Sequence, residues 1–144
     1  MRRVKTVCFA AAAVIVMSAA VAVYAEDNTY NYISPEELKS RIESDAPMTI
    51  LDIQVKDEFS QHHIKGAVPA YAYPVRTAEE KARIDEVYAE FAALPDPVII
   101  VCPRGGGGAM RTFDHLLDKG MPADRLFILE KGQGAWPYAE LLEK

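Results

Sequence analysis

A single cysteine followed by a run of glycines is the part of this sequence best suited to chemistry. Cys102 follows the apolar stretch 98–101, and Pro103 and Arg104 come next. Four consecutive glycines follow them: Gly105, Gly106, Gly107 and Gly108. Because glycine adopts positive φ readily, such a run can curl and turn successive amide N–H groups toward one small object. A helix beginning near residue 109 would add the positive end of its dipole. This setting stabilises a thiolate and also suits a persulfide or an oxyanion, so we predict that Cys102 is a nucleophile.

The glycine run does not match three better-known loops. No Gly-Lys-Ser/Thr ends it as in a phosphate-binding P-loop, and Met110 stands where a dinucleotide fingerprint needs a small residue. Gly108 occupies the place of the arginine in the Cys-x5-Arg loop of cysteine phosphatases. Arg104 is a candidate for binding an anionic substrate, and the alternative is a solvated loop cation. The alternative for Cys102 is a small buried hydrophobic residue.

Three further polar positions are candidates for supporting or structural roles. Asp52 lies near the end of the apolar run 48–53, and we expect it to form hydrogen bonds that shape a loop without transferring protons. His63 is predicted to be a structural hydrogen-bonding residue, because adjacent histidines such as His62 and His63 rarely bind one ion. Arg111 is expected to face solvent. We therefore predict no metal and no organic cofactor.

Short apolar runs alternate with helical patterns along the chain. The expected strands are 48–53, 67–70, 97–101 and 126–129, and the expected helices are 34–44, 56–60, 77–94, 109–119 and 135–143. This alternation predicts an α/β domain with a mainly parallel sheet. Ligands of such sheets bind beyond the carboxyl ends of the strands, which is where Cys102 and Asp52 fall.

The first residues have the pattern of a secretory signal peptide. A short basic start is followed by the uncharged run 7–24 and by Val23-Tyr24-Ala25 as a cleavage site. We predict a signal peptide over 1–25, a domain over 26–144 and an exported, periplasmic protein. The alternative is an uncleaved N-terminal membrane anchor.

Export changes the charge and the thiol content of the chain. The 144 residues carry 16 basic and 21 acidic side chains, and removal of the signal leaves 13 against 21, a net charge of −8. Such an acidic chain excludes the basic stripe of a nucleic-acid binder, so no nucleic-acid partner is expected. Cys8 lies within the signal, so Cys102 is the only thiol of the expected mature chain. A lone thiol cannot form an internal disulfide.

Four motifs in order resemble the single-domain rhodaneses, a family of sulfurtransferases. They are Tyr32-Ile33-Ser34-Pro35-Glu36-Glu37-Leu38; Leu51-Asp52-Ile53 with Asp57-Glu58-Phe59 and His63-Ile64-Lys65-Gly66-Ala67; Cys102 itself; and Leu129-Glu130-Lys131-Gly132 with Ala135-Trp136. The resemblance covers roughly residues 32–138. Two positions depart from the family pattern: Gln54 and Gly107 stand where arginines are usual.

The resemblance implies a rhodanese-like α/β fold with a five-stranded, mainly parallel sheet flanked by helices on both faces. It also implies ping-pong transfer through a Cys102 persulfide, with thiosulfate, a polysulfide or a persulfide as donor and a thiol or cyanide as acceptor. Expected partners are a small sulfur-donor anion and a thiol acceptor, with a redox protein as a further option. Two alternatives stay open: a non-catalytic module that binds an oxyanion or docks a redox partner, and another thiol enzyme such as a reductase or phosphatase.

Overall fold

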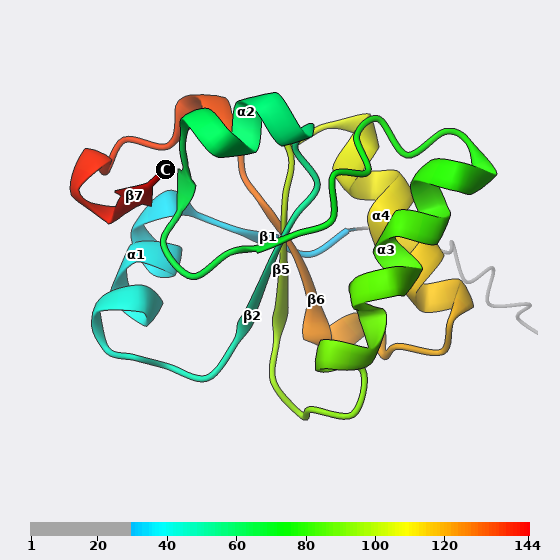
Figure 1. Cartoon of the computed structure of the whole chain (residues 1–144). Coiled ribbons are helices and arrows are strands. Elements are labelled where there is room, and N and C mark those ends of the chain that lie inside the picture. The colour runs from blue at the N-terminus through cyan, green and yellow to red at the C-terminus, as the bar shows by residue number, and fades with distance from the viewer. Residues whose placement is uncertain (1–29) are drawn as a thin grey trace, which may run out of the picture.

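Five parallel strands form the centre of the molecule. The computed structural model describes residues 30–144 and orders the strands β1 (Tyr32–Ile33), β6 (Leu126–Leu129), β5 (Val98–Val101), β2 (Thr49–Asp52) and β4 (Val68–Pro69) (Figure 1). All four residues of β5 are buried, as expected for a central parallel strand covered on both faces. Asp52 pairs with Val101, so β2 and β5 end at the same level. The predicted α/β architecture with a five-stranded parallel sheet is confirmed.

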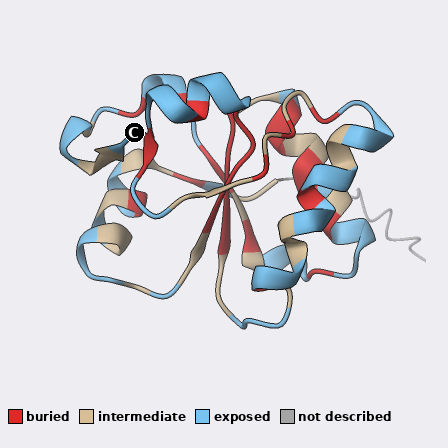
Figure 2. Ribbon diagram, viewed as in Figure 1, coloured by how far each residue is buried: buried red, intermediate tan, exposed pale blue. Residues whose placement is uncertain are grey.

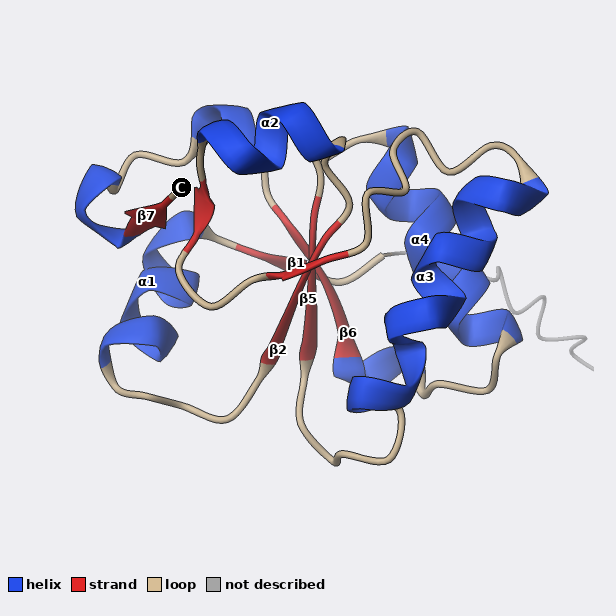
Figure 3. Cartoon of the chain, in the orientation of Figure 1, coloured by secondary structure: helices blue, strands red, loops and turns tan. Residues whose placement is uncertain are grey.

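Helices cover both faces of the sheet. In Figure 3, α1 (Pro35–Glu43) lies on one side, and α3 (Ala78–Phe91) and α4 (Gly107–Asp118) lie on the other. The short helix α2 (Lys56–Gln61) crosses the edge at which the strands end. Figure 2 shows buried residues on the strands and on the helix faces turned toward them. One part of the core includes Ile84 and Phe113 of the α3 and α4 side, and the other includes Leu38 of α1.

Side-chain caps start two of the helices. Ser34 Oγ accepts a hydrogen bond from the amide of Glu37 at 3.1 Å, and Pro35 occupies the first helical position. Thr77 and Glu80 form a reciprocal capping box at the start of α3, with distances of 3.2 and 3.0 Å. These caps satisfy amides that have no partner within the helix.

The predicted helix over 135–143 is wrong. The chain instead forms two 3₁₀ turns, η2 (Gln133–Ala135) and η3 (Ala139–Leu141), followed by strand β7 (Leu142–Glu143). Pro137 has no amide hydrogen and disfavours helical backbone at the residue before it, which interrupts the apolar periodicity. Strand β7 pairs antiparallel with β3 (His63–Ile64), more than 70 residues earlier, and that pairing stabilises the extended end.

The remaining regular element is a 3₁₀ turn, η1 (Ala123–Arg125), which leads into β6. Within residues 30–144, no helix is both long and apolar enough to span a bilayer. The predicted signal peptide lies outside the described residues.

Candidate active site

Cys102 is the first residue beyond β5, and its side chain is almost completely enclosed. Only 1% of the residue is exposed, and it packs in the core beside the α4 side of the sheet. The chain then curls back, so that the amide of Gly105 donates a hydrogen bond to Cys102 Sγ at 3.0 Å. Gly105 has φ +67°, a conformation that residues with a side chain rarely adopt. We call residues 102–106 the thiol loop. The curl of the thiol loop points the Gly105 N–H at the Cys102 sulfur.

A second loop, residues 130–134, holds the thiol loop in place, and we call it the closing loop. The amide of Gln133 donates to the Cys102 carbonyl at 2.8 Å, and the amide of Gly134 donates to the Pro103 carbonyl at 3.0 Å. Gly132, at φ +65° and ψ −167°, sits so close that a Cβ there would overlap the Cys102 carbonyl oxygen. A Cβ on Gly105 would lie 2.6 Å from the amide nitrogen of Lys131. The two loops therefore fit together only because each contributes a glycine.

The last two glycines of the run belong to helix α4 and have packing roles. Helix α4 begins at Gly107, after Gly106 as its N-cap, two residues earlier than predicted. A Cβ on Gly108 would lie 3.0 Å from the ring of Tyr73, and a Cβ on Gly107 would lie 2.8 Å from Arg111 Nη1. These positions are small because neighbouring side chains fill the space beside the first turn.

Arg111 does not face solvent as predicted. Its guanidinium donates to the Pro74 carbonyl at 2.7 and 3.1 Å and to the Val75 carbonyl at 3.1 Å. These bonds tie α4 to the turn that contains Tyr73, whose ring packs against Gly108. Arg111 therefore supports the wall of the site from behind. The sequence gives no signal for this, because residues 74 and 75 are far from Arg111 along the chain.

Arg104 lies at the exposed surface of the thiol loop. Within the part of the chain that the structure describes, its side chain makes no hydrogen bond and no ion pair. Its charge is therefore available to an anion that approaches the loop.

Asp52 is completely buried at the end of β2 and shapes the turn into α2. Its Oδ1 accepts from the Gln54 amide at 2.8 Å, and its Oδ2 accepts from Gln54 Nε2 at 2.9 Å. Burial raises the pKa of the Asp52 carboxyl to about 6, although the two hydrogen bonds from Gln54 lower it. Its hydrogen bonds go to Gln54 and not to the thiol loop, so it positions the β2–α2 turn.

His63 is a packed residue of β3, away from the thiol. Its Nδ1 lies 3.0 Å from the Phe59 carbonyl, and its ring stacks on that of Phe59 with centroids 3.8 Å apart. Its Nε2 lies 3.9 Å from a carboxylate oxygen of Glu143. These contacts fix α2 against β3 and β7. Among residues 30–144, no three acidic, histidine or cysteine side chains gather as a metal site would require.

The structure reveals a cavity of about 260 Å³ at the edge of the thiol loop that the sequence did not predict. Helix α2, the β2–α2 turn and both loops form its wall, which consists of Gln54, Glu58, Gln61, His62, Pro103, Gln133 and Gly134. Gln133 is 3% exposed, and neither its Oε1 nor its Nε2 has a hydrogen-bond partner in the described part of the chain. No sequence signal marks Gln133, since its surroundings arise only when the loops meet.

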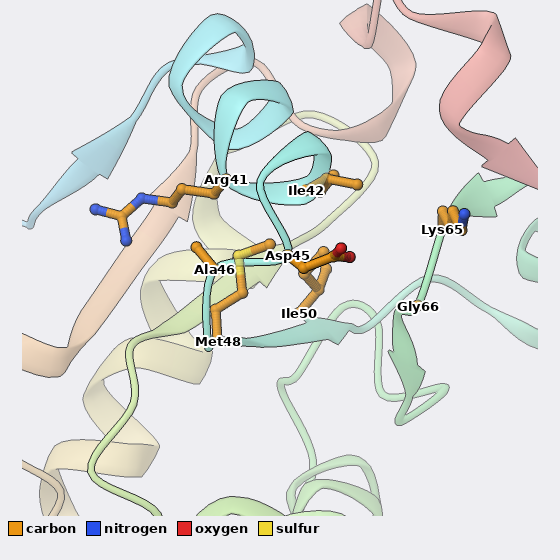
Figure 4. A pocket seen from close by; sticks show the side chains of 8 residues that line it. All are labelled: Arg41, Ile42, Asp45, Ala46, Met48, Ile50, Lys65 and Gly66. Carbon is orange, nitrogen blue, oxygen red and sulfur yellow. The ribbon is translucent and has the colours of Figure 1, made fainter.

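A different hollow of about 290 Å³ lies between the end of α1 and the start of β2 (Figure 4). Figure 4 shows Arg41 and Lys65 on opposite sides of it, with Met48 and Ile50 between them. None of the predicted site residues lines it.

Residues 34–138 match the family model of the rhodanese-like domain. No curated protein matches the chain. Solved structures share the fold. A rhodanese-related protein from Thermoplasma volcanium is 18% identical, with a TM-score of 0.54 over 74% of this chain and 90% of that one. An As-Sb reductase from Leishmania major is 18% identical, with a TM-score of 0.57 over 79% and 85%. A thiosulfate sulfurtransferase from Pseudomonas aeruginosa is 24% identical, with a TM-score of 0.57, and this match covers 78% of this chain but only 20% of that longer one.

Proposed function

Because the chain belongs to the rhodanese-like family, we propose that it is an exported sulfurtransferase that uses a persulfide on Cys102. The donor is thiosulfate, a polysulfide or another persulfide, and the acceptor is a thiol or cyanide. One observation carries the proposal: the Gly105 amide donates to Cys102 Sγ at 3.0 Å within a loop that two backbone hydrogen bonds from the closing loop hold in place. A hydrogen bond to a charged sulfur is stronger than one to a neutral thiol, so this contact favours the reactive anion.

The proposed reaction has two displacement steps and no net oxidation. The Cys102 thiolate attacks the outer sulfur of thiosulfate, the sulfur–sulfur bond of the donor breaks, and sulfite leaves with its electron pair. The acceptor thiolate then attacks the terminal sulfur of the Cys102 persulfide and leaves as a persulfide itself, which restores the Cys102 thiolate. The Gly105 N–H and the start of α4 stabilise the negative charge on sulfur before and after each step.

Arg104 is proposed to attract the anionic donor. It is exposed on the thiol loop, two residues after the nucleophile, and its cation has no partner among residues 30–144. A loop cation assists a charged donor more than a neutral sulfur species. Arg104→Ala is therefore expected to reduce the rate with thiosulfate more than the rate with a neutral polysulfane.

Intact mass spectrometry tests the central step. After exposure to thiosulfate or polysulfide, the protein should gain about 32 Da, one sulfur atom, and dithiothreitol should remove it. Cys102→Ser should abolish the gain while the far-ultraviolet circular dichroism stays unchanged. A folded protein that gains no sulfur from any donor would favour a module that binds an oxyanion or docks a redox partner.

The proposed export rests on residues 1–25, which lie outside the described structure. N-terminal sequencing of protein recovered outside the cytoplasm should return a chain that begins near Glu26. Full-length protein found only with membranes would support the anchor alternative instead.

A further inference from the structure

We propose that the cavity lined by Gln54 and Gln133 is a subsite that binds a peptide-type amide group of the thiol acceptor, with Gln133 as its specificity-determining residue. The identity of the ligand as the acceptor rests on the proposed function, whereas recognition of an amide does not. The cavity is bounded by α2 on one side and by the thiol and closing loops on the other.

Gln133 is the observation that points to a ligand. Gln133 is 97% buried. The oxygen and the nitrogen of its side chain are both shielded from solvent, and neither has a hydrogen-bond partner in residues 30–144. Buried polar groups are nearly always hydrogen-bonded, so an unpaired carboxamide calls for a missing partner. The Gln133 backbone is fixed by its bond to the Cys102 carbonyl, so the side chain cannot swing away with a mobile loop.

Gln54 supplies a second carboxamide to the same wall. Its Nε2 is engaged by Asp52 at 2.9 Å, and no hydrogen bond within the described residues ends on its Oε1. That bond to a buried carboxylate orients the Gln54 amide, and Oε1 and the second hydrogen of Nε2 remain available to a ligand. The two glutamines therefore offer uncharged donors and acceptors on the same wall.

This combination complements a peptide amide. A carboxamide such as that of Gln133 donates to a carbonyl and accepts from an N–H, so it pairs with an amide through two hydrogen bonds. The wall contains no lysine or arginine, and Glu58 adds a negative charge, so an anion such as thiosulfate is disfavoured. The volume of about 260 Å³ is below the roughly 300–1,000 Å³ of drug-sized sites. The cavity therefore suits a fragment of one or two residues.

The position of the cavity connects it with the acceptor half of the reaction. Pro103, directly after the nucleophile, is part of the wall, and Gly134 of the wall donates to the Pro103 carbonyl. An amide held there brings a thiol on the same fragment to the edge of the thiol loop.

The first arm of the test measures binding without chemistry. N-acetylalaninamide, which has no thiol, is titrated into 15N-labelled protein, and the side-chain NH2 resonances of the glutamines are followed. The NH2 resonances of Gln133 and Gln54 should shift until the site is saturated. Gln133→Met, which keeps the size of the side chain, should abolish the shift at Gln54. Glu79→Met, at an exposed position of α3 outside the cavity wall, is the control and should leave the titration unchanged.

The second arm measures the acceptor step. For each variant, kcat/KM with N-acetylcysteinamide is divided by kcat/KM with 2-mercaptoethanol, which removes effects common to both thiols. Loss of two hydrogen bonds in Gln133→Met should reduce this ratio about tenfold or more. Glu79→Met should keep the ratio of the unmodified protein.

The outcomes separate the two proposals. Sulfur gain at Cys102 without amide-induced shifts, and with the ratio unchanged in Gln133→Met, would overturn the subsite and leave a cavity filled by water. Shifts at Gln133 and Gln54 in a protein that never forms a persulfide would overturn the sulfurtransferase while the amide site stands.

Discussion

Replacement of Gly132 by alanine should separate the two loops that build the site. At φ +65° and ψ −167°, Gly132 occupies a region essentially reserved for glycine, so alanine costs about 1–3 kcal/mol in the backbone alone. Its Cβ would overlap the Cys102 carbonyl oxygen and lie 2.5 Å from the Gly105 nitrogen. The three nearest neighbours of that Cβ are backbone atoms, which cannot rotate away as a side chain can.

The expected loss of stability follows from these contacts. Overpacking adds about 1–3 kcal/mol. Separation of the loops also removes the Gln133-to-Cys102 and Gly105-to-Sγ hydrogen bonds, at about 1 kcal/mol each. We expect Gly132→Ala to lower the free energy of unfolding by about 5 kcal/mol, a large share of the roughly 5–15 kcal/mol of a typical domain.

Guanidinium unfolding followed by the fluorescence of Trp136, a largely buried residue and the only tryptophan of the chain, measures this loss. Gly66→Ala is the matched control, because Gly66 also has positive φ (+79°) but a Cβ there meets no atom within 4 Å. It should cost about 1 kcal/mol. If the two variants differ by less than 1 kcal/mol, the interlocking of the loops does not determine the stability of the site, and the reasoning fails.

Three further predictions concern buried polar groups. Because burial raises the pKa of the Asp52 carboxyl to about 6 in the folded protein, above its ordinary value of 3.8, folding stability should fall as pH rises from about 4 to about 6. The free energy of unfolding of Asp52→Asn, measured in guanidinium relative to the unmodified protein, should therefore rise by about 2 kcal/mol between pH 4 and pH 7, and a constant difference would contradict the assignment. Arg111→Met should cost about 2 kcal/mol through the lost bonds to the Pro74 and Val75 carbonyls, whereas the exposed Arg104→Met should change thermal unfolding by less than about 0.5 kcal/mol. Gln133→Met should raise the unfolding free energy by about 1 kcal/mol, since it removes two unpaired buried groups, and a loss of stability would show that they are satisfied by tightly held water.

The sequence predicts the central sheet because burial there is uniform. The run 126–129 forms β6 with the predicted bounds, and the predicted strand 97–101 forms β5 from residue 98 onward. The position of Cys102 after β5 follows from the same pattern. The predicted helices 34–44 and 77–94 begin within one residue of α1 and α3.

The features that the sequence did not predict depend on segments that meet only in the folded chain. The end of the chain has helical periodicity, but Pro137 and pairing with β3 convert it into turns and β7. Arg111 is satisfied by carbonyls of a turn more than 30 residues away. No local sequence pattern marks Gln133 as a cavity residue, since the cavity forms only when α2 and both loops are in place.

Because the thiol loop depends on the closing loop, the surroundings of Cys102 are complete only after the later part of the chain has folded. Cys102 is followed by α4, η1 and β6 before the chain reaches Gly132 and Gln133. A growing chain that has emerged only as far as α4 lacks the contacts that hold the Gly105 amide on the sulfur. During synthesis, and during any passage through a membrane as an unfolded chain, we therefore expect Cys102 to react like the cysteine of a flexible peptide. The contact between the Gly105 amide and the Cys102 sulfur is held in place only after β6 has joined the sheet and the closing loop has followed it.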